Sequence, residues 1–308
     1  TIKLEYGSFT QQIGMISQFR NESNFLQNRY ELTQEDYSNF LSREKQRDNQ
    51  NSLTRLFGRS LIELSASDTV AFGGFASINR YDTPSENNYD DRDEFQGNFG
   101  VSYSRVFSDY LTAKFLADIT ATHLVFLKSQ RSSLNNWNRV IRLNPIIEYT
   151  SESFSMKPSF ELLANYTAYD YENESSGSKS YSFRQISYSD TLKLKLYEQF
   201  SCESRVFAKY NERAILYWRS FSETPQQANY EIFANLIFFA NINDKSRAGI
   251  GARFYKLRQY NLPYSSMKFS LNQFYQESIG PEIYIFIQLS RNSNVIIKGW
   301  YEFRSFNN

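Results

Sequence analysis

The stretch from Leu111 to Val125 decides the fold: Leu-Thr-Ala-Lys-Phe-Leu-Ala-Asp-Ile-Thr-Ala-Thr-His-Leu-Val. Its odd-numbered positions are apolar apart from His123, whereas its even-numbered positions include Lys114, Asp118 and three threonines. This period of two predicts a long β-strand with one apolar and one polar face. Because a slip of one residue would invert both faces, the pattern also specifies two unlike surroundings for the strand.

The same alternation recurs along most of the chain. It is clear from Phe154 to Ala168, from Tyr230 to Ile242, from Ile279 to Leu289 and from Val295 to Phe303. No stretch of about 18 uncharged apolar residues exists, which excludes a helical membrane protein. The chain is therefore expected to be all-β.

Short turns and longer polar segments alternate between the expected strands, as in a series of up-and-down hairpins. The short turns are expected at Ser65–Thr69, Phe107–Tyr110, Thr150–Phe154, Ser201–Ser204, Asn241–Ser246 and Ser290–Asn294. The longer segments are Glu44–Ser52, Pro84–Arg92, Lys128–Asn136, Glu172–Lys179, Ser222–Ala228 and Asn261–Ser266. Short turns on one rim and longer loops on the other are typical of transmembrane barrels.

Composition supports a barrel that spans a membrane. Aromatic residues make up 17% of the 308 residues, yet the mean hydropathy is −0.57. Disordered chains lack such aromatics, whereas a transmembrane barrel exposes only every second strand residue to lipid. A closed barrel of a dozen or more strands is also too wide for side chains to fill, so the apolar face is expected to point outward.

We therefore expect one domain over residues 1–308: a closed antiparallel up-and-down transmembrane β-barrel of about fourteen strands, with twelve to sixteen tolerable. Residues 1–50 are the least regular part, and Asn21–Arg43, polar on both faces, is either a strand projecting beyond the membrane or a loop. Ser187–Asp190 is either an extra turn or part of one long strand. Pro145 and Pro158 lie within strands and predict bulges or rim positions, because proline donates no ladder hydrogen bond.

The chain's last strand carries a resemblance to a known class. The segment Val295–Phe306 is rich in aromatic residues and ends near Phe306. It resembles the C-terminal assembly signal of bacterial outer-membrane β-barrel proteins, from which it departs because Asn307 and Asn308 follow. The resemblance implies a location in the bacterial outer membrane, with membrane lipid as a partner.

Charged side chains in the inward register are the candidate functional residues. They are Arg55, Arg59, Glu63, Lys114, Asp118, Glu161, Arg205, Lys209, Arg213 and Arg253. An open lumen with this basic excess would weakly favour anions. The alternative, which the sequence favours, is that opposite charges on neighbouring strands pair and brace the wall.

Catalytic and cofactor chemistry find little support. His123 is the only histidine and no serine signature accompanies it, so no enzymatic activity is predicted, and we interpret it as an interfacial residue. With Cys202 as the one cysteine, too few ligands exist for a zinc site. Gly73-Gly74 precedes no helix and is not a phosphate loop, so no cofactor is expected. A net charge of +1 implies no nucleic-acid partner.

The sequence thus predicts a pore or transporter for small solutes. The alternative is a structural anchor of a larger envelope or secretion assembly, whose lumen a protein partner or the chain's own loops fill.

Overall fold

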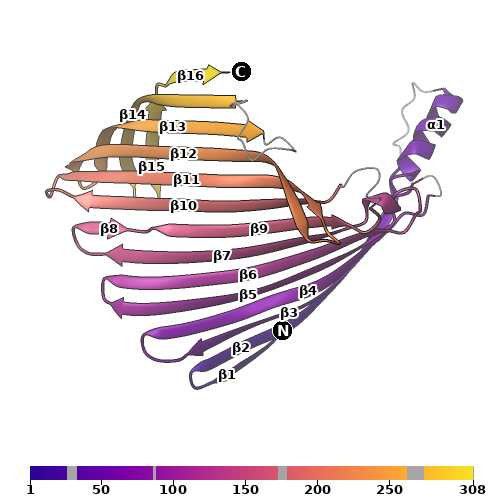
Figure 1. The fold of residues 1–308 in the computed structure, drawn as a ribbon. Helices are drawn as coiled ribbons and strands as arrows, with labels where there is room; N and C mark the ends of the chain where they lie inside the picture. Colours follow the sequence, from indigo (N-terminus) through magenta and orange to yellow (C-terminus); the bar gives the residue numbers. More distant parts are fainter. Residues whose placement is uncertain (26–32, 86–87, 173–178, 262–273, 308) are drawn as a thin grey trace.

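One antiparallel sheet dominates the computed structural model, which describes residues 1–308 except 26–32, 86–87, 173–178, 262–273 and 308. Each strand lies beside its neighbours in chain order, which confirms the all-β, up-and-down antiparallel prediction (Figure 1). The strands are β1 (Ile2–Tyr6), β2 (Phe9–Glu22), β3 (Asn49–Glu63), β4 (Asp68–Asp82), β5 (Arg92–Ser108), β6 (Leu111–Phe126), β7 (Asn136–Thr150), β8 (Phe154–Met156), β9 (Ser159–Tyr169), β10 (Tyr181–Lys195), β11 (Phe200–Tyr217), β12 (Ser222–Asn243), β13 (Ser246–Asn261), β14 (Phe274–Ser290), β15 (Ser293–Trp300) and β16 (Phe303–Asn307).

Two strand positions are each interrupted once. Both β8 and β9 lie between β7 and β10, and the break between them falls at Pro158. Likewise, β15 and β16 both pair with β14, and the break falls beside Pro281, whose carbonyl accepts a hydrogen bond from the Tyr301 N–H. Among the described residues, fourteen strand positions therefore follow one another across the sheet, within the expected range. The interruption at Pro158 fits the predicted irregularity. At Pro145 the register does not shift, but the pairing of β7 with β9 skips from Leu143 to Ile146.

Short turns lie at one rim of the sheet, the turn-side rim, and the longer connections lie at the other, the loop-side rim (Figure 1). One predicted turn is wrong: Ser201–Ser204 belongs to β11, and the turn lies four residues earlier, where the Leu196 and Tyr197 N–H groups bond to the Phe200 carbonyl. Ser187–Asp190 lies within the single long strand β10.

Two predicted loops also need correction. Of Glu44–Ser52, residues 49–52 belong to β3. Ser222–Ala228 belongs to β12, which pairs with β11 as far as Ser222. The register shifts between Arg213 and Ala214, where Ala214 lies opposite Pro225. The β11–β12 pairing then continues to Ser222, whereas β13 pairs with β12 only as far as Gln227. Of Asn261–Ser266, Asn261 ends β13 and the rest lies outside the described residues, as do 173–178 of the loop predicted at Glu172–Lys179.

The polar segment Asn21–Arg43 contains an element that the period-two pattern did not predict. Helix α1 (Gln34–Lys45) begins after Thr33, whose hydroxyl oxygen accepts a hydrogen bond from the Asp36 N–H. Acidic side chains occupy its first turn and basic ones its last, which favours a helix through the macrodipole. Among the described residues, no helix is long and apolar enough to cross a membrane.

The two faces of the sheet follow from strand register, because directly paired residues point the same way. Phe99, Ile119 and Phe238 lie on one face, which we call the apolar face. Their exposed fractions are 52%, 46% and 51%, respectively. No second layer covers this face in the described part of the chain, and few large side chains are buried. The faces therefore alternate as the sequence predicts, with large apolar side chains left open to the surroundings.

The sheet curls, so that β15 passes behind β11–β13 in Figure 1. Within the described residues, β1 pairs only with β2, and the last strand position pairs only with β14. The structure thus shows the antiparallel sheet and its curvature.

Candidate functional site on the polar face

The ten charged candidates named from the sequence all lie on the face opposite to Phe99 and Ile119, which we call the polar face. The strand register extends this assignment from strand to strand, because directly paired residues point to the same face. Arg55 pairs with Ser77, Asp118 pairs with Arg142, and Arg253 pairs with Asn235, all on this face. The alternation in the sequence therefore assigns these side chains to one face, as the register does, and their place in a lumen stays a prediction.

Opposite charges on neighbouring strands pair across much of the polar face. Glu148 lies between the Nζ atoms of Lys114, at 2.6 Å, and Lys157, at 2.7 Å. Arg142 Nε lies 2.8 Å from Asp118 Oδ1. This bracing is the arrangement that the sequence favoured over a wall of free charge.

The same bracing extends to the later strands. Lys209 Nζ lies 2.5 Å from Glu231 Oε2, and Arg253 Nε lies 3.3 Å from Glu302 Oε1. Glu161 accepts a hydrogen bond of 3.0 Å from the Gln185 amide. The pairing leaves fewer free cations than the sequence count suggests.

Arg55 and Arg59 on β3 differ from these residues. In the part of the chain that the structure describes, neither has an acidic partner within ion-pair distance. The Arg55 guanidinium instead lies 4.6 Å from the centre of the Phe75 ring, and its buried Nε–H has no hydrogen-bond partner there. An unsatisfied buried donor of this kind commonly marks the place of a water or an ion.

These two arginines line a depression of about 580 Å³ on the polar face. Phe57, Phe75 and Leu116 form its apolar walls, and Asp118 lies at its edge. Three of the ten candidates, Arg55, Arg59 and Asp118, therefore meet at one site. The aromatic walls were missed because Phe57 and Phe75 break the alternation, and that break was the available signal.

Glycines form the floor of the depression. A β-carbon at Gly73 would lie 2.8 Å from the Gly58 carbonyl oxygen, so only glycine allows these strands to approach as they do. At Gly100 a β-carbon would lie 3.5 Å from the Asp118 β-carbon, an ordinary contact. The absence of side chains at both positions creates the space.

The three basic candidates on β11, Arg205, Lys209 and Arg213, have different kinds of partner. Lys209 is ion-paired, whereas the Arg213 guanidinium lies 5.0 Å from the centre of the Tyr181 ring. Arg205 borders a small cavity of about 70 Å³ with Arg247 and Glu282. Arg247, which the sequence analysis did not select, pairs with Glu203 at 2.9 Å. This cavity is too crowded to resemble the depression on β3.

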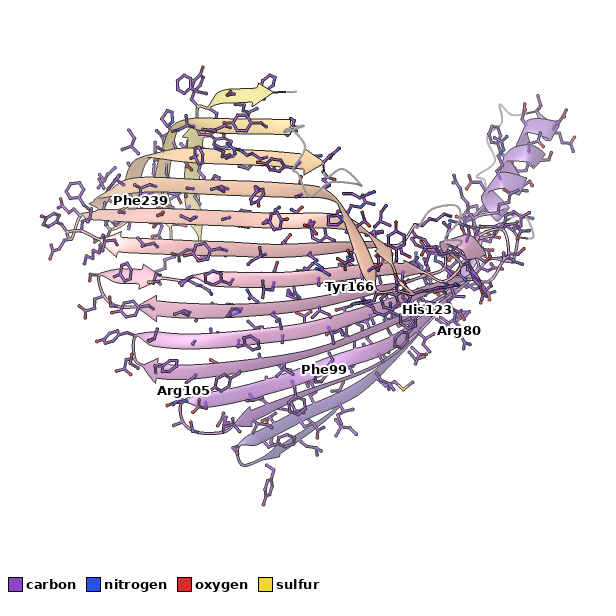
Figure 2. The ribbon with its side chains drawn as sticks, in the orientation of Figure 1. Arg80, Phe99, Arg105, His123, Tyr166 and Phe239 are labelled. Atoms are coloured by element: carbon purple, nitrogen blue, oxygen red, sulfur yellow. The ribbon has the colours of Figure 1, made fainter. Side chains whose placement is uncertain are left out.

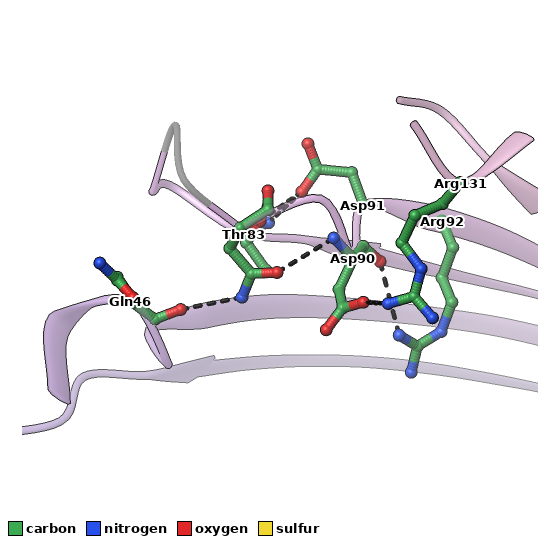
Figure 3. Close-up of polar contacts among 7 residues, drawn as sticks. Gln46, Thr83, Asp90, Asp91, Arg92 and Arg131 are labelled. Atoms are coloured by element: carbon green, nitrogen blue, oxygen red, sulfur yellow. Dashed lines mark hydrogen bonds and ion pairs between the residues drawn. The ribbon is translucent and has the colours of Figure 1, made fainter. Parts of the chain in front are cut away.

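The loop-side rim carries an interlocked set of polar contacts (Figure 3). Asp91 accepts hydrogen bonds from the Thr83 N–H, at 2.7 Å, and from the Thr83 hydroxyl, at 2.5 Å. Asp90 pairs with Arg131 of the next loop, and the Asn88 amide donates to the Gln46 carbonyl at the end of α1. These contacts tie three connections together at the rim.

The pKa of the Asp91 carboxyl reflects this setting. Burial alone would raise that pKa, but the hydrogen bonds from Thr83 and the Lys128 ammonium, 3.4 Å away, outweigh burial and hold the pKa below its ordinary value. The ionised carboxylate therefore stabilises the folded loop.

His123 lies on the apolar face near the loop-side rim, as predicted (Figure 2). Its Nε2 lies 2.8 Å from Asp170 Oδ2, and its ring stacks on Trp137 with 4.2 Å between ring centres. No serine hydroxyl contacts His123 among the contacts of the described residues, and no cluster of potential metal ligands is found there. His123 thus has an ion-pair partner and a stacking partner, and its interfacial position stays a prediction.

Two solved structures share this architecture at 8% sequence identity. The ferric-catecholate import receptor Fiu from E. coli K12, in its open form, matches 99% of this chain and 62% of its own, with a TM-score of 0.53. The copper transporter OprC matches 94% of this chain and 44% of its own, with a TM-score of 0.55. This chain has the fold of outer-membrane β-barrel transporters. The similarity in fold confirms the predicted resemblance to bacterial outer-membrane β-barrel proteins. It also agrees with the predicted location in the outer membrane.

The chain spans less than two thirds of the length of either transporter. No protein-family model and no curated protein matches its sequence. Both neighbours are transporters or receptors rather than enzymes. Their low identity to this chain means that the match supports the fold and carries no residue assignments.

Proposed function

We propose that this chain forms the wall of an outer-membrane transporter whose lumen is lined by the polar face and admits small anionic solutes. Turning the apolar face outward places Phe99, Ile119 and Phe238 in lipid. The same orientation exposes the ion-paired polar face to water in the lumen. An open sheet edge is not tolerated in hydrocarbon, so we further propose that β1 and the last strand position are paired in the membrane, with each other or through added strands.

The depression beside Arg55 and Arg59 is the observation that carries the choice of solute. Two guanidinium groups without acidic partners face it within the described residues, together with the unsatisfied Arg55 Nε–H. Cations of this kind attract anions at a constriction or along a pore wall. The aromatic rings of Phe57 and Phe75 add a surface on which a planar solute packs.

Single-channel conductance in a planar bilayer under a salt gradient tests this proposal. The wild-type protein is expected to give stable steps with a reversal potential that favours anions. Arg55→Gln combined with Arg59→Gln is expected to shift that potential toward cations. Arg105→Gln is the matched control, because Arg105 lies on the apolar face at the turn-side rim and pairs with Asp68 at 3.7 Å (Figure 2).

The second candidate function is a structural anchor with an occupied lumen. The observation that favours it is the dense cross-strand ion pairing, as at Glu148 with Lys114 and Lys157, which stiffens a wall without requiring solute passage. A correctly folded protein that conducts no current would contradict the transporter proposal and favour this one. Proteins that copurify with the folded chain would then be the next measurement.

A further inference from the structure

The apolar face carries a basic depression close to the loop-side rim. It has a volume of about 570 Å³ and is lined by Lys256 and Arg258 of β13, Tyr230 and Ile232 of β12, and Tyr260. Tyr230 pairs directly with Arg258, and Ile232 with Lys256. All of these side chains therefore point to the same face as Phe238 and Ile250, the face that we propose meets lipid.

Its position along the strand corresponds to the membrane interface. Arg258 lies three residues before the loop-side end of β13 at Asn261. A lysine or arginine facing lipid at mid-membrane costs about 2–4 kcal/mol, whereas near the interface the cost falls toward zero. Tyrosines on both sides of the two cations are also typical of the interface.

The charges at this depression do not cancel. Lys256 Nζ lies 3.2 Å from Glu277 Oε2, and Tyr275 also donates its hydroxyl to Glu277. Arg258 has no acidic partner within ion-pair distance in the described part of the chain, and its buried Nε–H has no hydrogen-bond partner there. The positive charge of Arg258 is therefore not balanced by an ion pair, and its Nε–H is available to an acceptor.

We propose that this depression binds the phosphate of an anionic lipid headgroup in the leaflet at the loop-side rim. Arg258 and Lys256 contact the phosphate, and the rings of Tyr230 and Tyr260 flank the headgroup. An acyl chain then follows Ile232 and the side chains below it toward mid-membrane. Basic pockets on a membrane-facing surface recognise anionic headgroups in this way. The inference rests on the proposed orientation of the two faces, and not on conduction.

Lipid retention measured by native mass spectrometry tests the proposal. Purified protein is exposed to equal amounts of phosphatidylglycerol and phosphatidylcholine with identical acyl chains. The wild type is expected to retain phosphatidylglycerol preferentially. Lys256→Gln combined with Arg258→Gln is expected to reduce that preference about tenfold, because each basic residue contributes a several-fold preference. Arg80→Gln combined with Arg105→Gln removes two cations from the same face elsewhere and is expected to leave the preference unchanged.

Several outcomes would overturn the proposal. They are an equal retention of both lipids by the wild type, an unchanged preference in the Lys256/Arg258 variant, and a loss of preference in the control. Inorganic phosphate that displaces the phosphatidylglycerol at low concentration would assign the site to a soluble anion. If the double variant does not fold, the wild type is compared at about 0.1 M and 1 M salt, over which the Debye length falls from about 10 to 3 Å. A preference that salt leaves unchanged would contradict the electrostatic site.

The result also separates this proposal from the proposed function. If the apolar face does not meet lipid, neither lipid is retained and both proposals fail. If both lipids are retained equally, the orientation holds and only the headgroup site fails.

Discussion

The ring of Phe239 covers Gly249, its direct partner on the neighbouring strand. A β-carbon at residue 249 would lie 2.6 Å from Phe239 Cδ1, closer than real side chains approach. Only 3% of Phe239 is exposed, and the Arg247 guanidinium lies 4.5 Å from the centre of its ring. The glycine is thus part of an aromatic packing site on a wall that otherwise has few buried large side chains.

Gly249→Val is therefore expected to destabilise the folded protein. Overpacking of a filled site costs about 1–3 kcal/mol. Phe239→Ala in the same chain removes the ring that the valine meets, so the cost of the valine is expected to fall. The free energy of unfolding of the wild type, both single variants and the double variant gives the coupling between the two positions. Strictly additive effects would show that the ring and the glycine are not in contact.

Filling the depression on the polar face is expected to alter conduction without unfolding the wall. A β-carbon at Gly100 makes an ordinary contact of 3.5 Å, so Gly100→Val adds side-chain volume to the floor at little strain. Gly58→Val is the control, because its β-carbon points to the apolar face and meets nothing closer than 3.7 Å. Conductance is expected to fall for Gly100→Val only. Equal conductance in both variants would exclude the depression from the solute path.

The loop-side rim is expected to loosen in acid through Asp91. Its folded-state pKa is held below the value of about 3.9 for an unfolded aspartate. The stabilisation is therefore fully present above about pH 4 and is lost as the pH falls through the folded-state pKa. The Thr83 amide, which donates to Asp91, is expected to lose its hydrogen-exchange protection over that acidic range.

Asp91→Asn provides the comparison for this titration. The asparagine oxygen still accepts a hydrogen bond, but it has no charge to lose. Protection of the Thr83 amide is expected to be lower than in the wild type by about 1 kcal/mol and flat with pH. A wild-type profile that is equally flat would rule out the carboxylate as the cause.

Strand alternation made most of the sheet predictable from sequence. Each residue's face depends only on whether its position is odd or even, and Leu111–Val125 shows the pattern without a register shift in the β6–β7 ladder. The errors lie where local composition misleads. Ser222–Ala228 is predicted to be a loop because it is rich in polar residues and contains Pro225. In the structure it is part of β12 and extends the β11–β12 hairpin beyond the neighbouring strands.

Helix α1 and the depression were missed for different physical reasons. The helix is mostly polar and has no buried residues, so its only apolar period is the short stripe of Tyr37, Phe40 and Leu41. Its capping Thr33 and its charged ends were the readable signals. The depression forms because Gly73, Gly100 and the side chains of β3 come together across several strands. Which of the cations keep a partner, such as Arg142 with Asp118, depends on side-chain reach that the sequence alone does not specify.

The central claim is that the apolar face meets lipid and the polar face meets water. Ala117 and Leu116 are adjacent in the middle of β6 and point to opposite faces. The measurement is the unfolding free energy of Ala117→Arg and Leu116→Arg in lipid bilayers. Ala117→Arg is expected to cost about 2–4 kcal/mol, because it places a charge in mid-membrane lipid, whereas Leu116→Arg is expected to cost much less. Equal costs, or a larger cost for Leu116→Arg, would contradict the assignment of the two faces.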